Sequence, residues 1–417
     1  MGIEKNKKVC LAYSGGLDTS VIVRWLADQG YDVIAVTVDL GQNENLNLKQ
    51  KALQSGAKKF VLKDMKQEFV EDGVFQLIKA EAKYENRYLL GTSIARPYIM
   101  KALVEVALKE KTNLIAHGAT GKGNDQCRFE LVAYSLMPNV EIIAPWRIKE
   151  FRELIPGRME AIAFAEKNGI PIKATTAKPW SIDANMAHSS FEAGILEDPN
   201  QKPPKAIYEV TCSPDKAPNT FTKLAIGFEN GVPVNVNGKK MSPVKLLNYL
   251  NTVGAKNGIG YIDIVENRFV GMKSRGVYQA PGVTILYQAH RDLEGLCMDR
   301  DLMHLRDQFI PQYAKTVYNG FWCSRQMQAL NTFVDETQKG ITGIVSLELY
   351  KGNVIITGRT SEYSLYSEKI ATMEGGGTFN QDDSTGFLKI QGLPLKVQAG
   401  INKKLGIHYF SKKRGSE

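Results

Sequence analysis

A pair of glycines between hydroxyl and carboxylate side chains is the first stretch of this sequence whose residue types could do chemistry. Residues 14–20 read SGGLDTS and stand between a short apolar run and a helical pattern. Glycines let the backbone approach a ligand and aim N–H groups at it, and a helix N-terminus favours an anion. The stretch therefore predicts a phosphate-binding loop, although a tight strand-to-helix turn could use the same residues.

This stretch differs from the common P-loop, G-x-x-x-x-G-K-[ST], whose lysine reaches the β- and γ-phosphates. No lysine stands at the corresponding place in SGGLDTS, and GATGKG at 118–123 lacks the P-loop spacing. The residues of the loop alone leave open which phosphates it would hold.

The elements that must position this loop alternate between strand and helix patterns through the first 170 residues. Strand patterns occupy 9–13, 32–40, 60–62 and 113–117, and helical patterns occupy 19–28, 45–55, 97–111 and 159–168. Alternation of this kind predicts an α/β fold with a parallel sheet, and ligands bind where its strands end. The loops at 14–18 and 118–125 should therefore meet at one edge of the sheet.

The character of the chain changes after residue 170. Prolines are frequent from 171 to 220, and hairpin patterns follow at 221–236 and 343–358. Helices are expected from 242 to 250 and from about 289 to 309. We expect three parts: an α/β domain at 1–170, an α+β domain at 171–365, and a C-terminal arm at 366–417.

Composition is that of an ordinary globular protein with a basic surface. The net charge is +9, which suits nucleic acid or small anionic substrates equally well. Five scattered cysteines form no C-x-x-C pair, which fits free thiols in a reducing compartment. No signal-peptide pattern and no apolar run of about 18 residues is present, so a cytoplasmic protein without a membrane span is expected.

The loop resembles the pyrophosphate-binding loop of the N-type ATP pyrophosphatases, which cleave ATP between the α- and β-phosphates. Other stretches distinguish among the relatives that share it. YLLGTSIARP at 88–97 and HGATGKGNDQCRFE at 117–130 resemble the argininosuccinate synthase family. The resemblance continues through PWSID at 179–183, EAGILE at 192–197, IVENRFVGMKSRGVY at 264–278 and GLPLKV at 392–397. It extends from residue 9 to about residue 398.

The resemblance implies a ligase that condenses L-citrulline with L-aspartate through a citrullyl-AMP intermediate, releasing AMP and pyrophosphate. ATP would be a co-substrate accompanied by Mg²⁺, and the reaction belongs to arginine biosynthesis. It also implies an N-terminal domain like the adenine nucleotide alpha hydrolases, an α+β synthetase domain and a C-terminal oligomerisation arm. The expected assembly is a homotetramer, with no nucleic-acid or membrane partner.

The resemblance also implies three sets of binding residues. The ATP set is Ala12, Tyr13, Ser14, Gly15, Gly16, Leu17, Asp18, Thr19, Ser20, Val38 and Gly118. The citrulline set is Tyr88, Ser93, Asn124, Arg128, Ser181, Ser190, Glu266 and Tyr278. The aspartate set is Thr120, Asn124 and Asp125.

The types of these residues suit the ligands. An arginine can hold the citrulline carboxylate as a fork, and Glu266 can pair with its ammonium. Asp125 faces a ligand with two carboxylates, so it is expected to hold the ammonium or help to deprotonate it. Asp18 is a candidate Mg²⁺ ligand or simply part of the helix start.

No residue is assigned as a covalent nucleophile, because adenylation itself makes the ureido oxygen a leaving group. Catalysis is then mostly positioning and charge stabilisation. Lys122 could be a further anion donor. A proton-transfer role for His117 is possible, but a structural role is favoured, and the five histidines show no metal-ligand spacing.

Two other functions compete with this interpretation. A tRNA-modifying adenylating enzyme would share the first loop, but it typically needs a thiol pair or an RNA-binding appendage. A nucleotide sensor without activity would tolerate losses among the polar motif residues, which are all present here.

Overall fold

The computed structural model describes residues 7–42, 48–171, 180–374 and 378–410, and these form two units, Met1–Tyr363 and Ser364–Glu417. The first unit begins with a five-stranded parallel sheet of order β3-β2-β1-β4-β5. Its strands are β1 (Lys8–Ala12), β2 (Asp32–Asp39), β3 (Lys59–Asp64), β4 (Leu114–Ala116) and β5 (Glu141–Ile143). The predicted α/β fold with a parallel sheet is confirmed.

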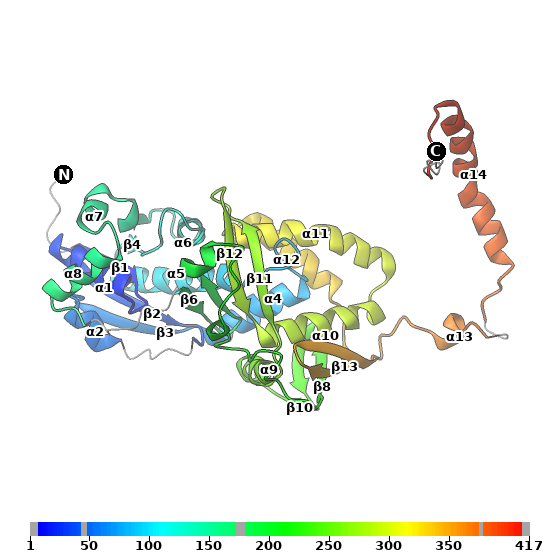
Figure 1. Ribbon diagram of the computed structural model, residues 1–417, viewed down its shortest axis with the longest axis horizontal. Helices are drawn as coiled ribbons and strands as arrows, with labels where there is room; N and C mark the ends of the chain where they lie inside the picture. Colours follow the sequence, from blue (N-terminus) through cyan, green and yellow to red (C-terminus); the bar gives the residue numbers. More distant parts are fainter. Residues whose placement is uncertain (1–6, 43–47, 172–179, 375–377, 411–417) are drawn as a thin grey trace, which may run out of the picture. The chain divides into compact units, whose positions relative to one another are not determined.

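Helices cover both faces of this sheet. Successive residues of a strand point to opposite faces, so neighbouring residues of β1 pack against different helices. Val9 and Leu11 pack in a cluster with α1 (Leu17–Asp28), α7 (Lys149–Leu154) and α8 (Arg158–Lys167). Cys10 belongs to the large core on the other face, which includes α5 (Gly91–Glu110). Figure 1 shows α1 and α8 together beside the blue strands of the sheet.

Shorter helices complete this part of the chain. They are α2 (Lys49–Gln54), α3 (Lys66–Glu68), the π-helix η1 (Phe69–Val74), α4 (Phe75–Lys79), α6 (Asp125–Leu136) and the 3-10 helix η2 (Pro145–Arg147). The helix expected at 45–55 is α2, although residues 45–47 lie outside the described part.

The remainder of the first unit contains two antiparallel sheets. One has the order β11-β12-β7-β6 and is made of β6 (Ser181–Ala184), β7 (Ser189–Glu192), β11 (Tyr261–Asn267) and β12 (Lys273–Gln279). The other has the order β10-β9-β8-β13-β14 and is made of β8 (Thr222–Glu229), β9 (Val232–Val236), β10 (Lys239–Lys240), β13 (Gly343–Tyr350) and β14 (Asn353–Thr360). Both predicted hairpins, β8–β9 and β13–β14, are confirmed.

Four long helices complete this unit: α9 (Pro243–Lys256), α10 (Pro281–Cys297), α11 (Arg300–Tyr318) and α12 (Arg325–Thr337). Helices α9 and α10 pack against the second of these sheets, whereas α11 and α12 pack against each other and against α5 and α4. Two 3-10 turns, η3 (Gly194–Glu197) and η4 (Lys205–Ile207), lie in the proline-rich segment. The second unit contains α13 (Glu368–Ala371) and α14 (Asp383–Lys404). No helix of the described residues is long and apolar enough to cross a membrane.

Two expected helix boundaries are wrong. The helix expected from Pro97 begins six residues earlier, so Pro97 lies inside α5. A proline in this position lacks one backbone donor, and tertiary packing around the buried residue outweighs that local cost. The helix expected at 289–309 is two helices, because the Asp299 side chain accepts hydrogen bonds from the N–H groups of Asp301 and Leu302 and caps α11.

Candidate active site

The first pocket lies at the carboxyl ends of the parallel strands, between the two loops that the sequence predicted to meet. Seven residues of the predicted ATP set line it: Ala12, Tyr13, Ser14, Gly16, Thr19, Val38 and Gly118. Gly15, Leu17, Asp18 and Ser20 belong to the same loop and helix start but do not line the pocket.

The geometry of the SGG loop follows from its small residues. Gly15 has φ +76°, and a Cβ there would lie 2.6 Å from the side chain of Leu48. The N–H of Gly16 donates to Ser14 Oγ at 3.3 Å, and the hydroxyls of Ser14 and Thr19 are 3.1 Å apart. The N-cap of α1 is Gly16, which offers no side-chain acceptor, so the first N–H groups of α1 remain free for an anion.

A lysine does reach this loop, but it comes from another element. Lys51 of α2 donates to the Gly15 carbonyl at 2.6 Å. Sequence reasoning missed this residue, because nothing in the pattern of α2 indicates which loop its side chain contacts.

Asp18 is the second residue of α1 and is exposed. It is not the N-cap, and its carboxylate makes no hydrogen bond or ion pair with any residue that the structure describes. A carboxylate oxygen is a donor that Mg²⁺ accepts, so the chemistry of Asp18 fits that ion.

A second pocket adjoins the first, since Ala119 and Asp125 line both. Seven residues of the predicted citrulline set line it: Tyr88, Asn124, Arg128, Ser181, Ser190, Glu266 and Tyr278. The three residues of the aspartate set, Thr120, Asn124 and Asp125, line it as well. Ser93 does not line it but is buried at the start of α5.

Several buried polar atoms here lack a partner among the described residues. They are Ser93 Oγ, Asn124 Oδ1 and Glu266 Oε2, together with Arg96 Nε beside the first pocket. A buried polar atom without a hydrogen bond costs about 1–3 kcal/mol. A polar ligand would complete the hydrogen bonds of Asn124 and Glu266, which line the second pocket.

Arginines and carboxylates alternate along the wall between the two pockets. Asp125 accepts from Arg96 at 2.7 Å and from Arg128 at 2.9 Å. Arg96 also pairs with Asp183 at 2.7 Å. Burial would raise the pKa of Asp125, but the two guanidinium groups outweigh it and lower that pKa to about 2. Asp125 is therefore ionised at any physiological pH.

The Arg128 guanidinium is fixed through Nε and Nη1, which leaves Nη2 for a ligand. Its Nε donates to the carbonyl of Tyr318 at 2.9 Å, and its guanidinium lies 4.8 Å from the centre of the Tyr318 ring. Nη1 is used by Asp125, and Nη2 makes no hydrogen bond to a described residue. Tyr318 also donates to Glu266 at 2.9 Å, so it orients both charged groups predicted for citrulline.

His117 supports the loop and does not face either pocket. Its Nδ1 accepts from the N–H of Ala119 at 3.2 Å, and its Nε2 lies 3.1 Å from Glu130. Both ring nitrogens are thus used, and the side chain is buried. Lys122 is exposed, and its backbone carbonyl accepts from Arg268.

His188 contributes a neutral ring near the same wall. It lies 2.9 Å from the hydroxyl of Thr92, which donates to Asp183 at 3.1 Å. Burial lowers the pKa of His188 to about 4, so the ring is uncharged at neutral pH. Thr92 and Arg96 stand inside the motif at 88–97, which is the sequence signal that could have marked them.

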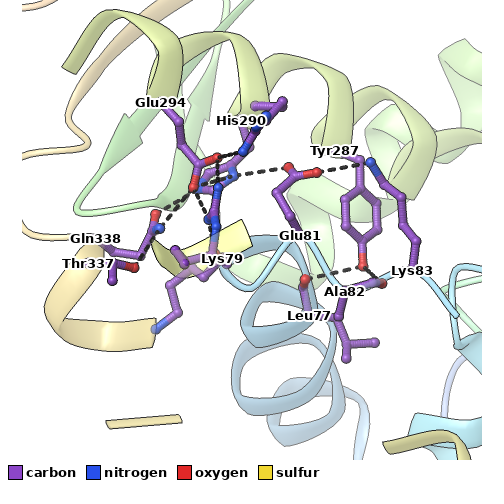
Figure 2. Close-up of polar contacts among 12 residues, drawn as sticks. Leu77, Lys79, Glu81, Ala82, Lys83, Tyr287, His290, Glu294, Thr337 and Gln338 are labelled. Atoms are coloured by element: carbon purple, nitrogen blue, oxygen red, sulfur yellow. Dashed lines mark hydrogen bonds and ion pairs between the residues drawn. The ribbon is translucent and has the colours of Figure 1, made fainter. Parts of the chain in front are cut away.

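A separate buried cluster joins Glu81, His290 and Glu294, whose ligand-type atoms lie within 4.8 Å of one another. Figure 2 shows that the cluster also includes Gln338, which lies close to His290 and Glu294. Both oxygens of Glu294 already accept from Arg306, at 2.5 and 2.6 Å. A metal ion there would lie against that guanidinium, so the cluster fits an internal ion-pair network and not a metal site.

Comparison with known proteins identifies similar sequences along nearly the whole chain. Residues 8–171 match the family model "Arginosuccinate synthase N-terminal HUP domain", and residues 180–398 match "Arginosuccinate synthase C-terminal domain". The argininosuccinate synthase of Rhodopirellula baltica is 52% identical over 95% of this chain and 99% of that protein. That of Desulfitobacterium hafniense DCB-2 is 53% identical over 96% of this chain and 100% of that protein. That of Thermotoga sp. RQ2 is 50% identical over 95% and 98% respectively.

Proposed function

The chain belongs to the argininosuccinate synthase family, and from this premise we propose that it condenses L-citrulline with L-aspartate, converting ATP to AMP and pyrophosphate. The observation that carries the proposal is the pair of adjoining pockets, one over the SGG loop and one lined by the predicted amino-acid residues. Because both family matches together extend from residue 8 to 398, a tRNA-modifying enzyme that shares only the first loop is not favoured.

ATP would occupy the first pocket with its pyrophosphate on the SGG loop. The N–H groups of the first turn of α1 supply donors for that leaving group. Lys51, 2.6 Å from the Gly15 carbonyl, adds a positive charge beside the loop. These donors suit a departing pyrophosphate, whose charge increases as the bond to the α-phosphorus breaks.

Citrulline would occupy the second pocket with its ureido end toward the boundary that Ala119 and Asp125 form. Arg128 would bind its carboxylate, and Glu266 its ammonium. The ureido oxygen attacks the α-phosphorus, a P–O bond forms, and the bond between that phosphorus and the α–β bridging oxygen breaks. The products of this step are citrullyl-AMP and pyrophosphate.

Aspartate would then bind over Thr120, Asn124 and Asp125. Its nitrogen, once it has lost a proton, attacks the ureido carbon, a C–N bond forms, and the C–O bond to AMP breaks. A pKa of about 2 makes Asp125 a poor proton acceptor. We therefore assign Asp125 to holding the ammonium in place, which a carboxylate that already accepts two hydrogen bonds can still do.

Magnesium is proposed to accompany ATP, with Asp18 as its protein ligand or as a partner of its water. When bound, the ion would neutralise charge on the phosphates. Asp18 fits this role because its carboxylate is exposed beside the loop and makes no ion pair with a described residue.

The remaining expectations concern organisation. We propose a cytoplasmic homotetramer and retain the division at 1–170, 171–365 and 366–417. The exposed apolar side chains of α14 support a role for the last part in assembly, since a second copy could cover them.

The test of the function is a pyrophosphate-release assay on the purified chain. Release over many turnovers is expected only when ATP, citrulline and aspartate are all present, with argininosuccinate as the product. Exchange of labelled pyrophosphate into ATP is expected with citrulline alone, because the first step is reversible before aspartate binds. ATP binding without release in the full mixture would contradict the proposal.

A further inference from the structure

The predicted aspartate subsite lacks a positive charge. Aspartate carries two carboxylates, whereas the subsite offers a hydroxyl from Thr120, an amide from Asn124 and the anionic Asp125. A pocket that binds two carboxylates normally supplies arginine or lysine donors for them. The cation for a substrate carboxylate must therefore come from elsewhere on the pocket wall.

Four cationic side chains line this pocket: Arg128, Arg268, Lys273 and Arg275. Arg128 is assigned to citrulline. Arg275 is largely occupied, because four of its five N–H donors are used: Nε and Nη2 bind Asp263 at 2.9 and 2.7 Å, and Nη1 binds two backbone carbonyls at 2.7 and 2.8 Å. Lys273 is exposed and its ammonium donates to Asn267 at 2.7 Å.

Arg268 differs from the other three in both position and contacts. Its guanidinium pairs with Glu192 at 2.8 Å through Nη2 and makes a long contact of 3.4 Å to the Lys122 carbonyl through Nη1. Its Nε makes no hydrogen bond to a described residue. The side chain is only 22% exposed, so a carboxylate bound to it would be partly shielded from water.

The place of Arg268 in the fold brings it over the aspartate subsite. It stands in the turn of the β11–β12 hairpin, where its N–H donates to the Met272 carbonyl at 2.8 Å. Gly271, with φ +96°, allows the tight reversal. The contact with Lys122 joins this turn to the loop that carries Thr120 and Asn124, so the arginine spans the subsite.

We propose that Arg268 binds a carboxylate of the aspartate substrate, exchanging its weak contact with the Lys122 carbonyl for a charge-assisted one. Glu192 holds the guanidinium in the pocket before the substrate arrives. This inference rests on the proposed function, because it assigns a binding residue to the second substrate of that reaction.

The two steps of the reaction make the inference separable from the function. Arg268→Gln should raise the KM for aspartate about 10- to 100-fold, the range expected when a charge-assisted hydrogen bond is lost. Citrulline-dependent exchange of pyrophosphate into ATP should change less than about twofold, since aspartate takes no part in it. That exchange also reports that the variant is folded. Arg268→Lys, which keeps the charge, should recover part of the affinity for aspartate.

Arg300→Gln serves as the matched control, because it removes an equally positive side chain that is exposed and pairs with Asp301. An unchanged aspartate KM in Arg268→Gln would overturn the inference, and so would a rise in KM that occurs in Lys273→Gln instead. A loss of exchange and aspartate use together would also overturn it, because Arg268 would then support the whole pocket. Absence of citrulline-dependent exchange in the wild-type protein would contradict the proposed function itself.

Discussion

At the scale of single residues, Arg128 and Asp125 are defined by their neighbours more than by their own types. Asp125 sits between two arginines and stays ionised, whereas Arg128 is fixed by the Tyr318 carbonyl and ring and keeps one nitrogen for a ligand. The sequence predicted both as ligand-binding residues. It left open whether Asp125 accepts a proton, and the pKa of about 2 favours charge pairing.

Arg128→Ala should raise the KM for citrulline about 100-fold, or roughly 2.7 kcal/mol, because a carboxylate loses a charge-assisted partner. The Kd for ATP should change less than about threefold, since Arg128 does not line the pocket proposed for the nucleotide. Steady-state kinetics and equilibrium ATP binding measure the two effects. Arg359→Ala is the control, because it removes an arginine of β14 that pairs with Asp292 of α10. Equal weakening of citrulline and ATP would mean that the assignment is wrong.

At the scale of elements, a buried network joins the segment after α4 to three helices. His290 and Glu294 come from α10, Gln338 follows α12, and Glu81 follows α4 (Figure 2). Arg306 of α11 pairs with Glu294. The segment after Glu81 leads to Tyr88 and the start of α5, both at the pocket proposed for citrulline. The network therefore holds in place the start of this segment, which forms no helix or strand of its own before α5.

The stability of this network should depend on pH through His290. Burial alone would lower the pKa of His290, but Glu294 and Glu81 outweigh burial and raise it. Gln338 is a further hydrogen-bond partner of the ring, and Arg306 pairs with Glu294. A raised pKa means that the charged ring stabilises the fold below about pH 6.5. This contribution is lost as the pH rises through the higher folded-state pKa.

His290→Gln should therefore lower the free energy of unfolding more at pH 6 than at pH 9. Urea unfolding of both proteins at the two pH values measures the difference. His304→Gln, which changes an exposed histidine of α11 outside the network, should show no comparable effect. An equal loss at both pH values would contradict a charged His290.

At the scale of the whole molecule, the composition and the exposed apolar side chains of α14 are unusual for a helix of a single chain. It contains Gly386, Gly392, Gly400 and Pro394 within 22 residues, and these residues disfavour an isolated helix. Its apolar side chains, such as Leu388 and Leu393, are exposed by 65% and 58%. Packing against a second copy would bury these side chains and stabilise the helix.

Leu393→Asp should convert the proposed tetramer to smaller species, because a buried carboxylate without a partner costs several kcal/mol. Light scattering coupled to size-exclusion chromatography gives the mass of the wild-type protein and the variant. Lys396→Ala changes an exposed polar position on the same helix and should leave the mass unchanged. A wild-type monomer, or a variant with unchanged mass, would contradict assembly through α14.

The local sequence was sufficient for the elements whose signal is local. Buried β-branched strands such as 32–39, the glycine turn at 14–16 and the hairpin around 229–231 depend on neighbouring residues, so their patterns predicted them. The antiparallel sheet of β6, β7, β11 and β12 was not predicted. Its strands are polar and come from two segments about 70 residues apart, and local patterns do not indicate such pairings.

What the sequence determined by itself was the glycine loop after β1, the parallel sheet and the family, because each depends on contiguous residues. The tertiary structure decided which charges face one another: Lys51 on the SGG loop, Arg96 between two carboxylates, and Arg268 above the loop of Lys122. The physical reason is distance along the chain. Arg268 and Lys122 are 146 residues apart, and only the folded packing of a hairpin against a loop sets their separation to 3.4 Å.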